Sequence, residues 1–336
     1  LGIALLKAAS GIPPLLTGCL LAGLTLAPNR SVRSAAENLS SPATVASSIL
    51  TLQVLFTLAL LRKLNTYLNR LAQNNFSLRS EAHNYNWPHE VAVVTGAAGG
   101  IGTAICLDLA AKGLTVCALD IAPQLPPALH QNPRIHLFPC DVSSRAAVLS
   151  TAQAILAAHG PPSILINNAG VAYVHDTLRA SEPALRHTLD VNLLAHYWTL
   201  HAFLPPMLDA RKGHIVSVAS LASFVATPGL GPYAASKAAL LVLHECLAQE
   251  LRVLHRVPEV KLSIVHPTFV ATAMTRRLGS IVRRPPPLLA PRDVSRAVVE
   301  QVMSATGGQV VLSGALGPVP QMLRALPHWL AYAALR

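Results

Sequence analysis

The most constraining feature of the chain is a glycine-rich turn between an apolar strand and an apolar helix. The run Val91–Val94 is followed by Thr95-Gly96-Ala97-Ala98-Gly99-Gly100-Ile101-Gly102, and Ile101–Ala111 continues in a helical pattern. Glycine lets backbone N–H groups approach a pyrophosphate, and a helix N-terminus favours negative charge. Glycines also form ordinary tight turns, so the turn alone is weak evidence. Its position between strand and helix favours a dinucleotide site at Gly96, Gly100 and Gly102.

Downstream of Glu90 the sequence alternates between short apolar strands and longer helical segments. Such alternation predicts an α/β fold, a Rossmann-type doubly wound parallel sheet with helices on both faces. Further helices are expected over Arg145–Ala158, Ala184–Leu204 and Tyr233–Leu254. The seven expected strands lie near residues 91–95, 115–119, 135–138, 164–166, 214–219, 261–265 and 309–312. Ligands bind at the carboxyl ends of such strands, so the polar residues found there are candidates for a functional site.

The second expected strand ends in an acidic residue, Asp120. A carboxylate at this place can accept hydrogen bonds from adenosine ribose hydroxyls, and it repels a 2′-phosphate. No arginine or lysine stands in the glycine turn or just after Asp120. These residues favour NAD(H) over NADP(H), although an acid that only caps the strand would give the same pattern.

Tyr233 and Lys237 stand four residues apart in an expected helix, and Ser220 follows the strand upstream of them. Residues at i and i+4 share a helix face, so both side chains can reach one site. A free tyrosine has a pKa of about 10, which a neighbouring ammonium lowers. A serine hydroxyl at a strand end can hold a substrate oxygen. The three residues therefore predict an acid/base, its tuner and an orienting group.

With these motifs, the chain from about residue 91 to residue 314 resembles the short-chain dehydrogenase/reductase family. The resemblance implies that Asn192 holds a proton-relay water and that Asp141 contacts the adenine. It gives Asn192, Ser220, Tyr233 and Lys237 as the catalytic set. The cofactor contacts that it implies are Gly96, Gly100, Ile101, Gly102, Asp120, Asp141, Val142, Asn168, Ala169, Gly170, Tyr233, Lys237, Pro267, Val270 and Thr272.

One position departs from the family's pattern. Where the family has Pro-Gly after the sixth strand, this chain has His266-Pro267-Thr268. A threonine at position 268 stiffens the turn, so the backbone path there is open. Val270 and Thr272 still suit contacts to the nicotinamide carboxamide.

The first 62 residues carry a different signal. Ala43–Leu61 has no charged residue and precedes Arg62 and Lys63. A stretch of about 20 apolar residues can cross the hydrocarbon core of a membrane. Ser10–Ala27 is also uncharged, and the mean hydropathy of the chain is +0.44. Membrane attachment is the favoured interpretation, with packing helices or a targeting segment as the alternatives.

The net charge of +11 is concentrated at the two ends of the chain. Basic residues beside apolar segments suit an anionic membrane surface. Nucleic-acid binding is not expected, because aromatic residues make up only 4% and no nucleic-acid module is recognisable. The five cysteines show no CxxC spacing and the 14 histidines are scattered, so no metal site is predicted. Cys106 and Cys117 are expected in the core.

The expected organisation has four parts. They are a membrane-anchor region over residues 1–62, a connector over 63–90, a catalytic domain over 91–314 and an apolar tail over 315–336. A substrate lid is expected near 268–292, where Arg276, Arg277, Arg283 and Arg284 either contact substrate or form a solvated basic loop. The tail either packs on the domain or enters a bilayer.

Three further features narrow the resemblance to one branch of the family. They are the apolar N-terminus, the run Gly213-His214-Ile215-Val216 and the tail over Leu326–Leu330. They are similar to a membrane-bound branch of retinol and 17-beta-hydroxysteroid dehydrogenases of endoplasmic reticulum and lipid droplets. The branch implies NAD(P)-dependent interconversion of a lipophilic alcohol (retinoid, steroid or long-chain lipid) and its carbonyl. It also implies contact with membrane lipids and is compatible with a homodimer. The alternatives are an NADPH-dependent carbonyl reductase and a non-catalytic scaffold on those surfaces that keeps the fold.

Overall fold

The computed structural model describes residues 42–278, 287–314, 317 and 319–334. The chain divides into two compact units, Leu1–Arg70 and Leu71–Arg336. The predicted apolar segment Ser10–Ala27 lies outside the described residues, as do Arg283 and Arg284 of the predicted lid.

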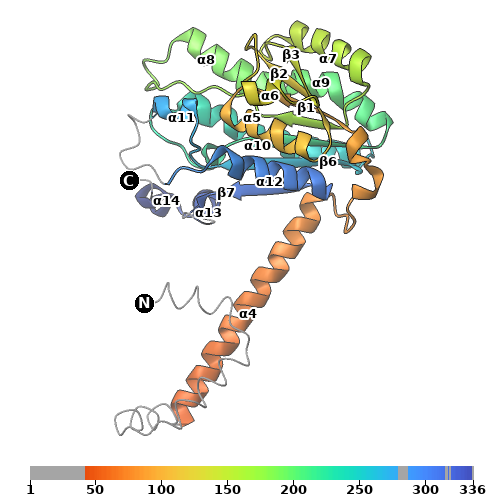
Figure 1. The fold of residues 1–336 in the computed structure, drawn as a ribbon. Coiled ribbons are helices and arrows are strands. Elements are labelled where there is room, and N and C mark those ends of the chain that lie inside the picture. Colours follow the sequence, from red (N-terminus) through yellow and green to blue (C-terminus); the bar gives the residue numbers. More distant parts are fainter. Residues whose placement is uncertain (1–41, 279–286, 315–316, 318, 335–336) are drawn as a thin grey trace, which may run out of the picture. The chain divides into compact units, whose positions relative to one another are not determined.

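A seven-stranded parallel sheet forms the centre of the second unit (Figure 1). Its strand order is β3-β2-β1-β4-β5-β6-β7, and every neighbouring pair is parallel. The predicted doubly wound fold is therefore confirmed. The strands are β1 (Val91–Thr95), β2 (Thr115–Asp120), β3 (Ile135–Pro139), β4 (Ile164–Asn167), β5 (Gly213–Val218), β6 (Val260–Pro267) and β7 (Gly308–Leu312).

Both faces of the sheet are covered by helices, which explains why the strands are apolar almost throughout. In β1, Ala92 and Val94 join one buried cluster, whereas Val91 and Val93 join the other. The first face packs against α5 (Gly100–Ala111), α6 (Pro127–His130) and α12 (Pro291–Ser304). The second packs against α7 (Arg145–His159), α9 (Ala195–Asp209) and α10 (Gly231–Val253). Cys106 and Cys117 are buried, as predicted.

One predicted helix is divided in the structure. The segment expected as a single helix over Ala184–Leu204 comprises α8 (Glu182–Leu189), a π-helical turn η3 (Asp190–Leu194) and α9. Hydrophobic periodicity does not reveal a π turn, because one extra residue per turn shifts the apolar stripe without ending it. Asn192 lies inside this turn.

The helix α4 (Pro42–Gln73) contains the predicted anchor stretch Ala43–Leu61. It runs past the expected boundary at residue 62, so much of the expected connector is helical. From residue 50 onward most of its apolar side chains are solvent-exposed; Leu50 and Phe56 are 62% and 63% exposed, whereas Leu55 and Leu71 are half-buried. Among the helices of the described residues, none is both long enough and apolar enough to cross a membrane.

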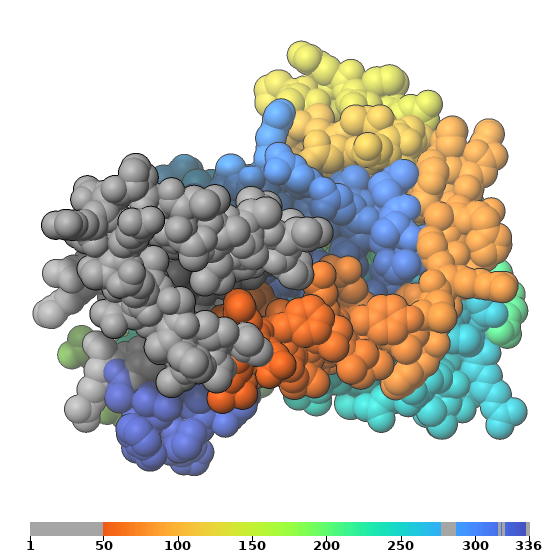
Figure 2. All heavy atoms as spheres, turned by 90° about the horizontal axis from the view of Figure 1, so that it is seen from below, coloured from red at the N-terminus to blue at the C-terminus, as the bar shows by residue number. Residues whose placement is uncertain are grey.

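The segment from Gln73 to Glu90 lies along the edge formed by β6, α12 and β7, and we call it the collar. Figure 2 shows its orange surface beside the blue surface of α12 and the cyan surface before β6. Asn74 is buried; its amide donates to Ser77 O (2.7 Å) and Arg79 O (3.2 Å) and accepts from Gly307 N (3.0 Å). The collar also contains two short 3-10 turns, η1 (Ala82–Asn84) and η2 (Trp87–His89).

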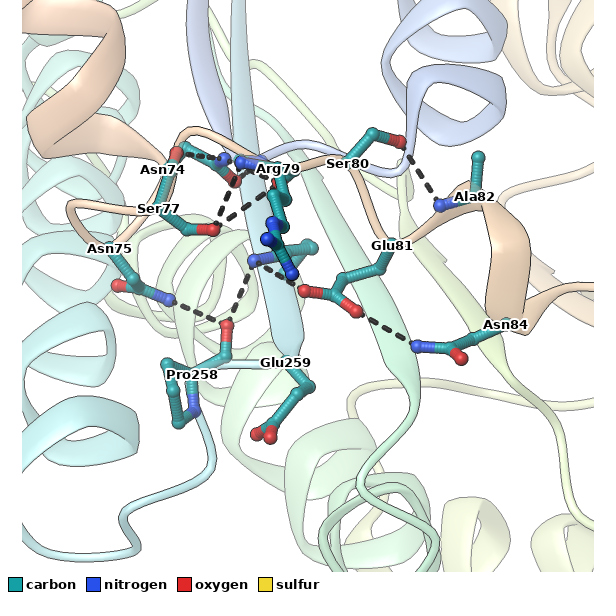
Figure 3. A network of polar contacts seen from close by, with 12 residues as sticks. Asn74, Asn75, Ser77, Arg79, Ser80, Glu81, Ala82, Asn84, Pro258 and Glu259 are labelled. Carbon is teal, nitrogen blue, oxygen red and sulfur yellow. Dashed lines mark hydrogen bonds and ion pairs between the residues drawn. The ribbon is translucent and has the colours of Figure 1, made fainter.

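A buried lysine, Lys261, holds the collar to β6. Its partners Glu81 and Pro258 are labelled in Figure 3. Lys261 is only 1% exposed and donates to Pro258 O at 3.0 Å. Its Nζ lies 3.7 Å from a carboxylate oxygen of Glu81, and Asn75 donates to the same Pro258 carbonyl at 3.3 Å. The collar is therefore an ordered part of the second unit.

The chain after β7 returns toward the carboxyl edge of the sheet. It forms α13 (Val319–Met322), η6 (Leu323–Ala325) and α14 (His328–Ala334). Leu323 is buried, and Arg324 Nε donates to Phe224 O at 3.1 Å. Trp329 and Tyr332 of α14 are more than 70% exposed. The tail thus packs through its first part and leaves aromatic residues of its second part in solvent.

Candidate active site

The carboxyl edge of the sheet gathers most of the predicted site residues. The glycine turn follows β1, Asp120 ends β2, Asn168–Gly170 follow β4, Ser220 follows β5, and Pro267 ends β6. The order of the strands changes direction between β1 and β4, because β2 and β3 lie to one side of β1 and the later strands to the other. Ligands of open parallel sheets bind at this switch point.

The glycine turn requires glycine at positions that the backbone itself defines. Gly96 has φ +65°, and a Cβ there would lie 2.8 Å from Ala169 Cα. A Cβ on Gly102 would lie 2.1 Å from Gly96 O, which only a residue without a side chain can tolerate. The turn and the loop after β4 therefore pack backbone against backbone.

A threonine and an asparagine fasten these two loops together. Thr95 Oγ1 accepts from the backbone N–H groups of Asn168 and Ala169, both at 3.0 Å. The Asn168 amide donates to Thr95 O at 3.0 Å and to Gly96 O at 3.1 Å. Asn168 was predicted to contact the cofactor; in the structure its side chain shapes the turn.

Asp120 is held by two backbone groups. Its Oδ2 accepts from Ala98 N–H at 2.8 Å and its Oδ1 from Ala122 N–H at 2.9 Å. Each carboxylate oxygen has further lone pairs for other donors. The residue after Asp120 is the uncharged Ile121, so the sequence places no cation next to the carboxylate. The Ile121 side chain is 76% exposed.

The residues at this edge fit a dinucleotide. Helix α5 begins at Gly100 without a side-chain cap, which leaves its first N–H groups for an anion. A Cβ on Gly170 would lie 3.4 Å from Asn192 Oδ1 and 3.6 Å from Lys237 Nζ, so a side chain there would occupy the space between the glycine turn and the predicted catalytic residues.

Tyr233 and Lys237 project from the first turns of α10. Lys237 is 3% exposed, and its Nζ lies 5.8 Å from the centre of the Tyr233 ring and donates to Val218 O at 3.0 Å. Burial lowers the pKa of Lys237 to about 8. Burial also raises the pKa of the Tyr233 phenol, and a hydrogen bond with the Ser220 side chain lowers it. The net direction is opposite to the one expected from Lys237 alone, because removal from water disfavours the charged phenolate.

Ser220 stands at the start of a single 3-10 turn, η4 (Leu221–Ser223). Its Oγ accepts from Ala222 N–H at 3.1 Å, and its carbonyl accepts from Ser223 N–H at 3.0 Å. Ser223 Oγ donates to Lys237 O at 2.8 Å. The turn is thereby tied to the helix that carries Tyr233 and Lys237.

Asn192 is fully buried in the π-helical turn η3. Its Nδ2 donates to Val171 O (2.9 Å) and Ser236 Oγ (3.1 Å), and its Oδ1 accepts from Val171 N–H (2.8 Å). Ser236 in turn donates to Tyr233 O at 2.7 Å. The side chain of Asn192 therefore connects the loop after β4 to α10, and its predicted role in holding a water stays a prediction.

The other predicted contacts lie in the segments that follow β3 and β6. Asp141 is exposed after β3, and its Oδ1 accepts from the backbone and hydroxyl of Ser143. Val142 is buried. Val270 pairs with Leu289 through an isolated bridge, and Thr272 Cγ2 lies 3.3 Å from where a Cβ on Gly100 would be. The described parts of the predicted lid are residues 268–278, which include α11 (Ala273–Leu278), and residues 287–292.

Sequence reasoning missed four residues that organise this site. They share a hydroxyl or imidazole group that bonds to the backbone of a predicted residue, and they are Thr95, Ser223, Ser236 and His266. Spacing alone could not find Thr95, Ser223 and His266, since their partners lie on other elements. Ser236 bonds to Tyr233 within the same helix, α10. Within the described residues, no group of three His, Cys, Asp or Glu side chains could hold a metal ion.

Comparison with known proteins gives a consistent result. The sequence profile of short chain dehydrogenases matches residues 90–281. Dehydrogenase RED2 of Cochliobolus heterostrophus is 36% identical over 205 residues, which cover 61% of this chain and 76% of that protein. Estradiol 17-beta-dehydrogenase 11 of Homo sapiens is 34% identical over 223 residues, or 64% of this chain and 72% of that protein. Retinol dehydrogenase 10-B of Danio rerio is 33% identical over 210 residues, or 55% and 62%.

A solved structure agrees with the fold. The aldohexose dehydrogenase of Thermoplasma acidophilum superposes with a TM-score of 0.57 at 24% identity, covering 66% of this chain and 91% of that one. The profile match takes in the glycine turn, Ser220, Tyr233 and Lys237 alike. The chain belongs to the short-chain dehydrogenase family, in the branch that resembles steroid and retinol dehydrogenases, and is an oxidoreductase that acts on CH–OH groups with a nicotinamide cofactor.

Proposed function

We propose that this oxidoreductase interconverts a lipophilic alcohol and its carbonyl, with NAD(H) as cofactor and Tyr233 as proton carrier. One observation supports this most: Tyr233 interacts with the hydroxyl of Ser220 and lies near the ammonium of Lys237, which itself lies close to Gly170 in the loop after β4.

A bound nicotinamide would supply the hydride acceptor or donor and, when oxidised, a positive charge. The backbone of Gly96, Gly100 and Gly102 would hold its pyrophosphate, and Asp120 its adenosine ribose. Lys237 would hold the nicotinamide ribose. With a pKa of about 8, most of the Lys237 side chain remains an ammonium at neutral pH, so it can donate to such hydroxyls.

The proton moves at Tyr233 Oη. In oxidation the phenolate takes the proton of the substrate hydroxyl, and in reduction the phenol gives it back. Because burial raises the pKa of Tyr233, the phenol is the resting form at neutral pH. Reduction can start from that form, whereas oxidation first requires loss of the phenol proton. Ser220 Oγ holds the substrate oxygen beside Oη by a hydrogen bond.

The preference for NAD(H) is supported by charge. Asp120 disfavours a 2′-phosphate, and Ile121 occupies a position from which a cation could have compensated. Asp141, the only other acid proposed at the cofactor, lies at the same edge and is also without a neighbouring cation in the sequence.

A lipophilic substrate is supported by the surroundings of the Ser220 turn. Arg324 ties the tail to Phe224 of this turn, and the tail exposes Met322, Trp329 and Tyr332. Two relatives are named for a steroid and for retinol, which are both lipophilic alcohols. The exposed apolar side chains of α4 support attachment to a lipid surface such as that of the endoplasmic reticulum or a lipid droplet.

The test is a substrate panel with full-length protein in native membranes. Estradiol, retinol and dodecanol are offered with NAD or NADP, and glucose is the polar control. We expect NAD reduction with at least one lipophilic alcohol and none with glucose. Faster reaction with glucose would overturn the substrate class, and faster reaction with NADP would overturn the cofactor preference. Binding of NAD without turnover of any alcohol or carbonyl would support the scaffold alternative.

Membrane attachment has its own test, carbonate extraction of full-length protein and of a variant that lacks residues 1–62. We expect the full-length protein to stay in the pellet and the variant to leave it at least partly. Full-length protein in the soluble fraction would rule out an embedded segment.

A further inference from the structure

A fully buried histidine touches the turn that carries Ser220. His266, near the end of β6, places Nδ1 at 3.1 Å from Ser220 O and 3.2 Å from Ser223 Oγ. Its Nε2 lies 3.2 Å from Gln309 Nε2 on β7. Its ring packs against Phe224, with centroids 4.6 Å apart. Four contacts thus surround one imidazole, and three of them come from residues 220–224.

The partners define which nitrogen carries the proton. A backbone carbonyl only accepts, so Nδ1 must be the N–H that donates to Ser220 O. An amide nitrogen only donates, so Nε2 accepts from Gln309. Burial lowers the pKa of His266 to about 4, which keeps the ring neutral and this tautomer in place at physiological pH.

The turn needs such a support. With only three residues, η4 is too short to be stable by its own hydrogen bonds. Apart from its internal bonds, Ser220 O has His266 as a partner from another element. Ser223 joins the same imidazole to Lys237 O, so His266 is a common anchor for the strand end and the start of α10.

We propose that His266 is a positioning residue: its Nδ1–H fixes the Ser220 carbonyl, and through it the direction of the Ser220 hydroxyl toward Tyr233. This inference rests on the role proposed for Ser220. His266 stands two residues before Thr268, the position at which the chain departs from the family pattern, and its contacts give a physical reason for a hydrogen-bonding side chain at position 266.

Two substitutions separate hydrogen bonding from packing. His266→Phe keeps a ring against Phe224 but has no donor. His266→Asn loses the ring, but its Nδ2 takes nearly the place of Nδ1 and can donate to Ser220 O. We expect His266→Phe to lower kcat/KM about tenfold, whereas His266→Asn stays within about threefold of wild type, since one hydrogen bond contributes roughly 1 kcal/mol.

A second readout does not depend on turnover. Amide hydrogen exchange of Ala222, Ser223 and Phe224 is measured in the full-length protein with NADH bound. These amides bond to Ser220 Oγ, Ser220 O and Leu221 O. We expect about tenfold faster exchange in His266→Phe and near wild-type exchange in His266→Asn. The NADH dissociation constant should stay within about threefold of wild type in both variants, because the side chain of His266 contacts Ser220, Ser223, Phe224 and Gln309, none of which is a proposed cofactor contact.

His214→Phe is the matched control. His214 is a buried histidine of the neighbouring strand β5, bonded to Ser263 at 2.9 Å and not to the turn. The His214→Phe substitution should lower the free energy of unfolding without changing amide hydrogen exchange at residues 222–224. Wild-type exchange and activity in His266→Phe, or an equal loss in His266→Asn, would overturn the inference. Ser220→Ala measured in parallel separates the two proposals: if it keeps full activity, the role of Ser220 fails, and the exchange data still decide whether His266 fixes the turn.

Discussion

At the scale of single residues, the site is governed by the competition between burial and hydrogen bonding at Tyr233. Desolvation raises the phenol pKa and Ser220 lowers it. A group with a raised pKa is a good proton donor at neutral pH and becomes a base only at higher pH. Carbonyl reduction should therefore be favoured near neutral pH, and alcohol oxidation should become faster as the pH rises.

Ser220→Ala should move the pH dependence of alcohol oxidation. Oxidation needs the Tyr233 phenolate, so kcat/KM should rise with pH through the pKa of Tyr233. Loss of the Ser220 hydroxyl removes the interaction that lowers this pKa, so the rise should occur at higher pH, with activity below it reduced by roughly 10²-fold. Ser217→Ala is the control, because Ser217 lies on the neighbouring strand β5 and is not a proposed site residue. A rise at unchanged or lower pH would contradict the proposed contact.

Asp120→Ala combined with Ile121→Arg should shift the preference from NAD toward NADP. The change removes the repulsion of a 2′-phosphate and adds a cation at an exposed position. A shift in the kcat/KM ratio of about 10–100-fold is expected, because one charge-assisted contact contributes about 1.5–3 kcal/mol. Ile121→Arg alone is the control for the added charge. A wild-type protein that already prefers NADP would show that Asp120 does not select the cofactor.

The proximity of Tyr233 to Lys237 and Ser220 could be expected from the sequence, because each stands near a strand end or on one helix face; their catalytic roles stay predictions. It did not predict that the Asn192 and Asn168 side chains would be engaged by neighbouring backbone groups. Such contacts join residues more than 20 positions apart, and spacing along the chain carries no information about them. His266 illustrates the same limit, since its partners come from two other elements.

At the scale of elements, the strands were predicted to within two residues at either end, since buried apolar runs flanked by polar residues are distinctive. The structure differs from the expectation at Ala184–Leu204, which a π turn divides, and α4 runs past residue 62 into the connector, where some helix was expected. The helical pattern of α4 continues through polar residues to Gln73, and a π turn left the second segment's apolar pattern intact. The collar was expected as a polar connector with some helix. Its packing was not predicted, because its partners lie far away in the sequence, for example Lys261 and Gly307.

Asn74→Ala should loosen the collar. The substitution removes three hydrogen bonds of a side chain that is 6% exposed and leaves the Gly307 N–H without its partner. The free energy of unfolding should fall by about 1–3 kcal/mol. Chemical denaturation followed by circular dichroism measures the change. Asn86→Ala, at an exposed position of the same segment, should leave stability within about 0.5 kcal/mol of wild type. Equal effects of the two substitutions would show that the collar contacts do not stabilise the second unit.

At the scale of the whole molecule, several buried histidines make the fold sensitive to acid. Burial lowers the pKa of His196 and His214 to about 3 and that of His266 to about 4. In the unfolded chain each of these histidines has a pKa of about 6.5. Below that pH the unfolded state takes up protons that the folded state does not, so the stability present above it is lost as the pH falls.

Stability should therefore decline steadily from pH 7 toward pH 5. Each of the three histidines contributes a slope of up to about 1.4 kcal/mol per pH unit below its unfolded pKa. His214→Phe should make the slope shallower by about one such increment, whatever its effect at pH 7. The measurement is the free energy of unfolding at several pH values. A slope that is unchanged in this variant would mean that His214 is not neutral in the folded protein.

The central claim is that Tyr233 carries the proton at a nicotinamide site, and Tyr233→Phe tests it most directly. The ring still packs against Lys237, but the hydroxyl is gone. Turnover of the best alcohol of the panel, followed by nicotinamide absorbance, should fall by about 10²–10⁴-fold, while the NADH dissociation constant stays nearly unchanged. Tyr197→Phe, at a tyrosine that is 40% exposed on α9, should keep full activity. Turnover by Tyr233→Phe within about threefold of wild type would contradict the account, because general acid–base catalysis cannot be lost at so small a cost.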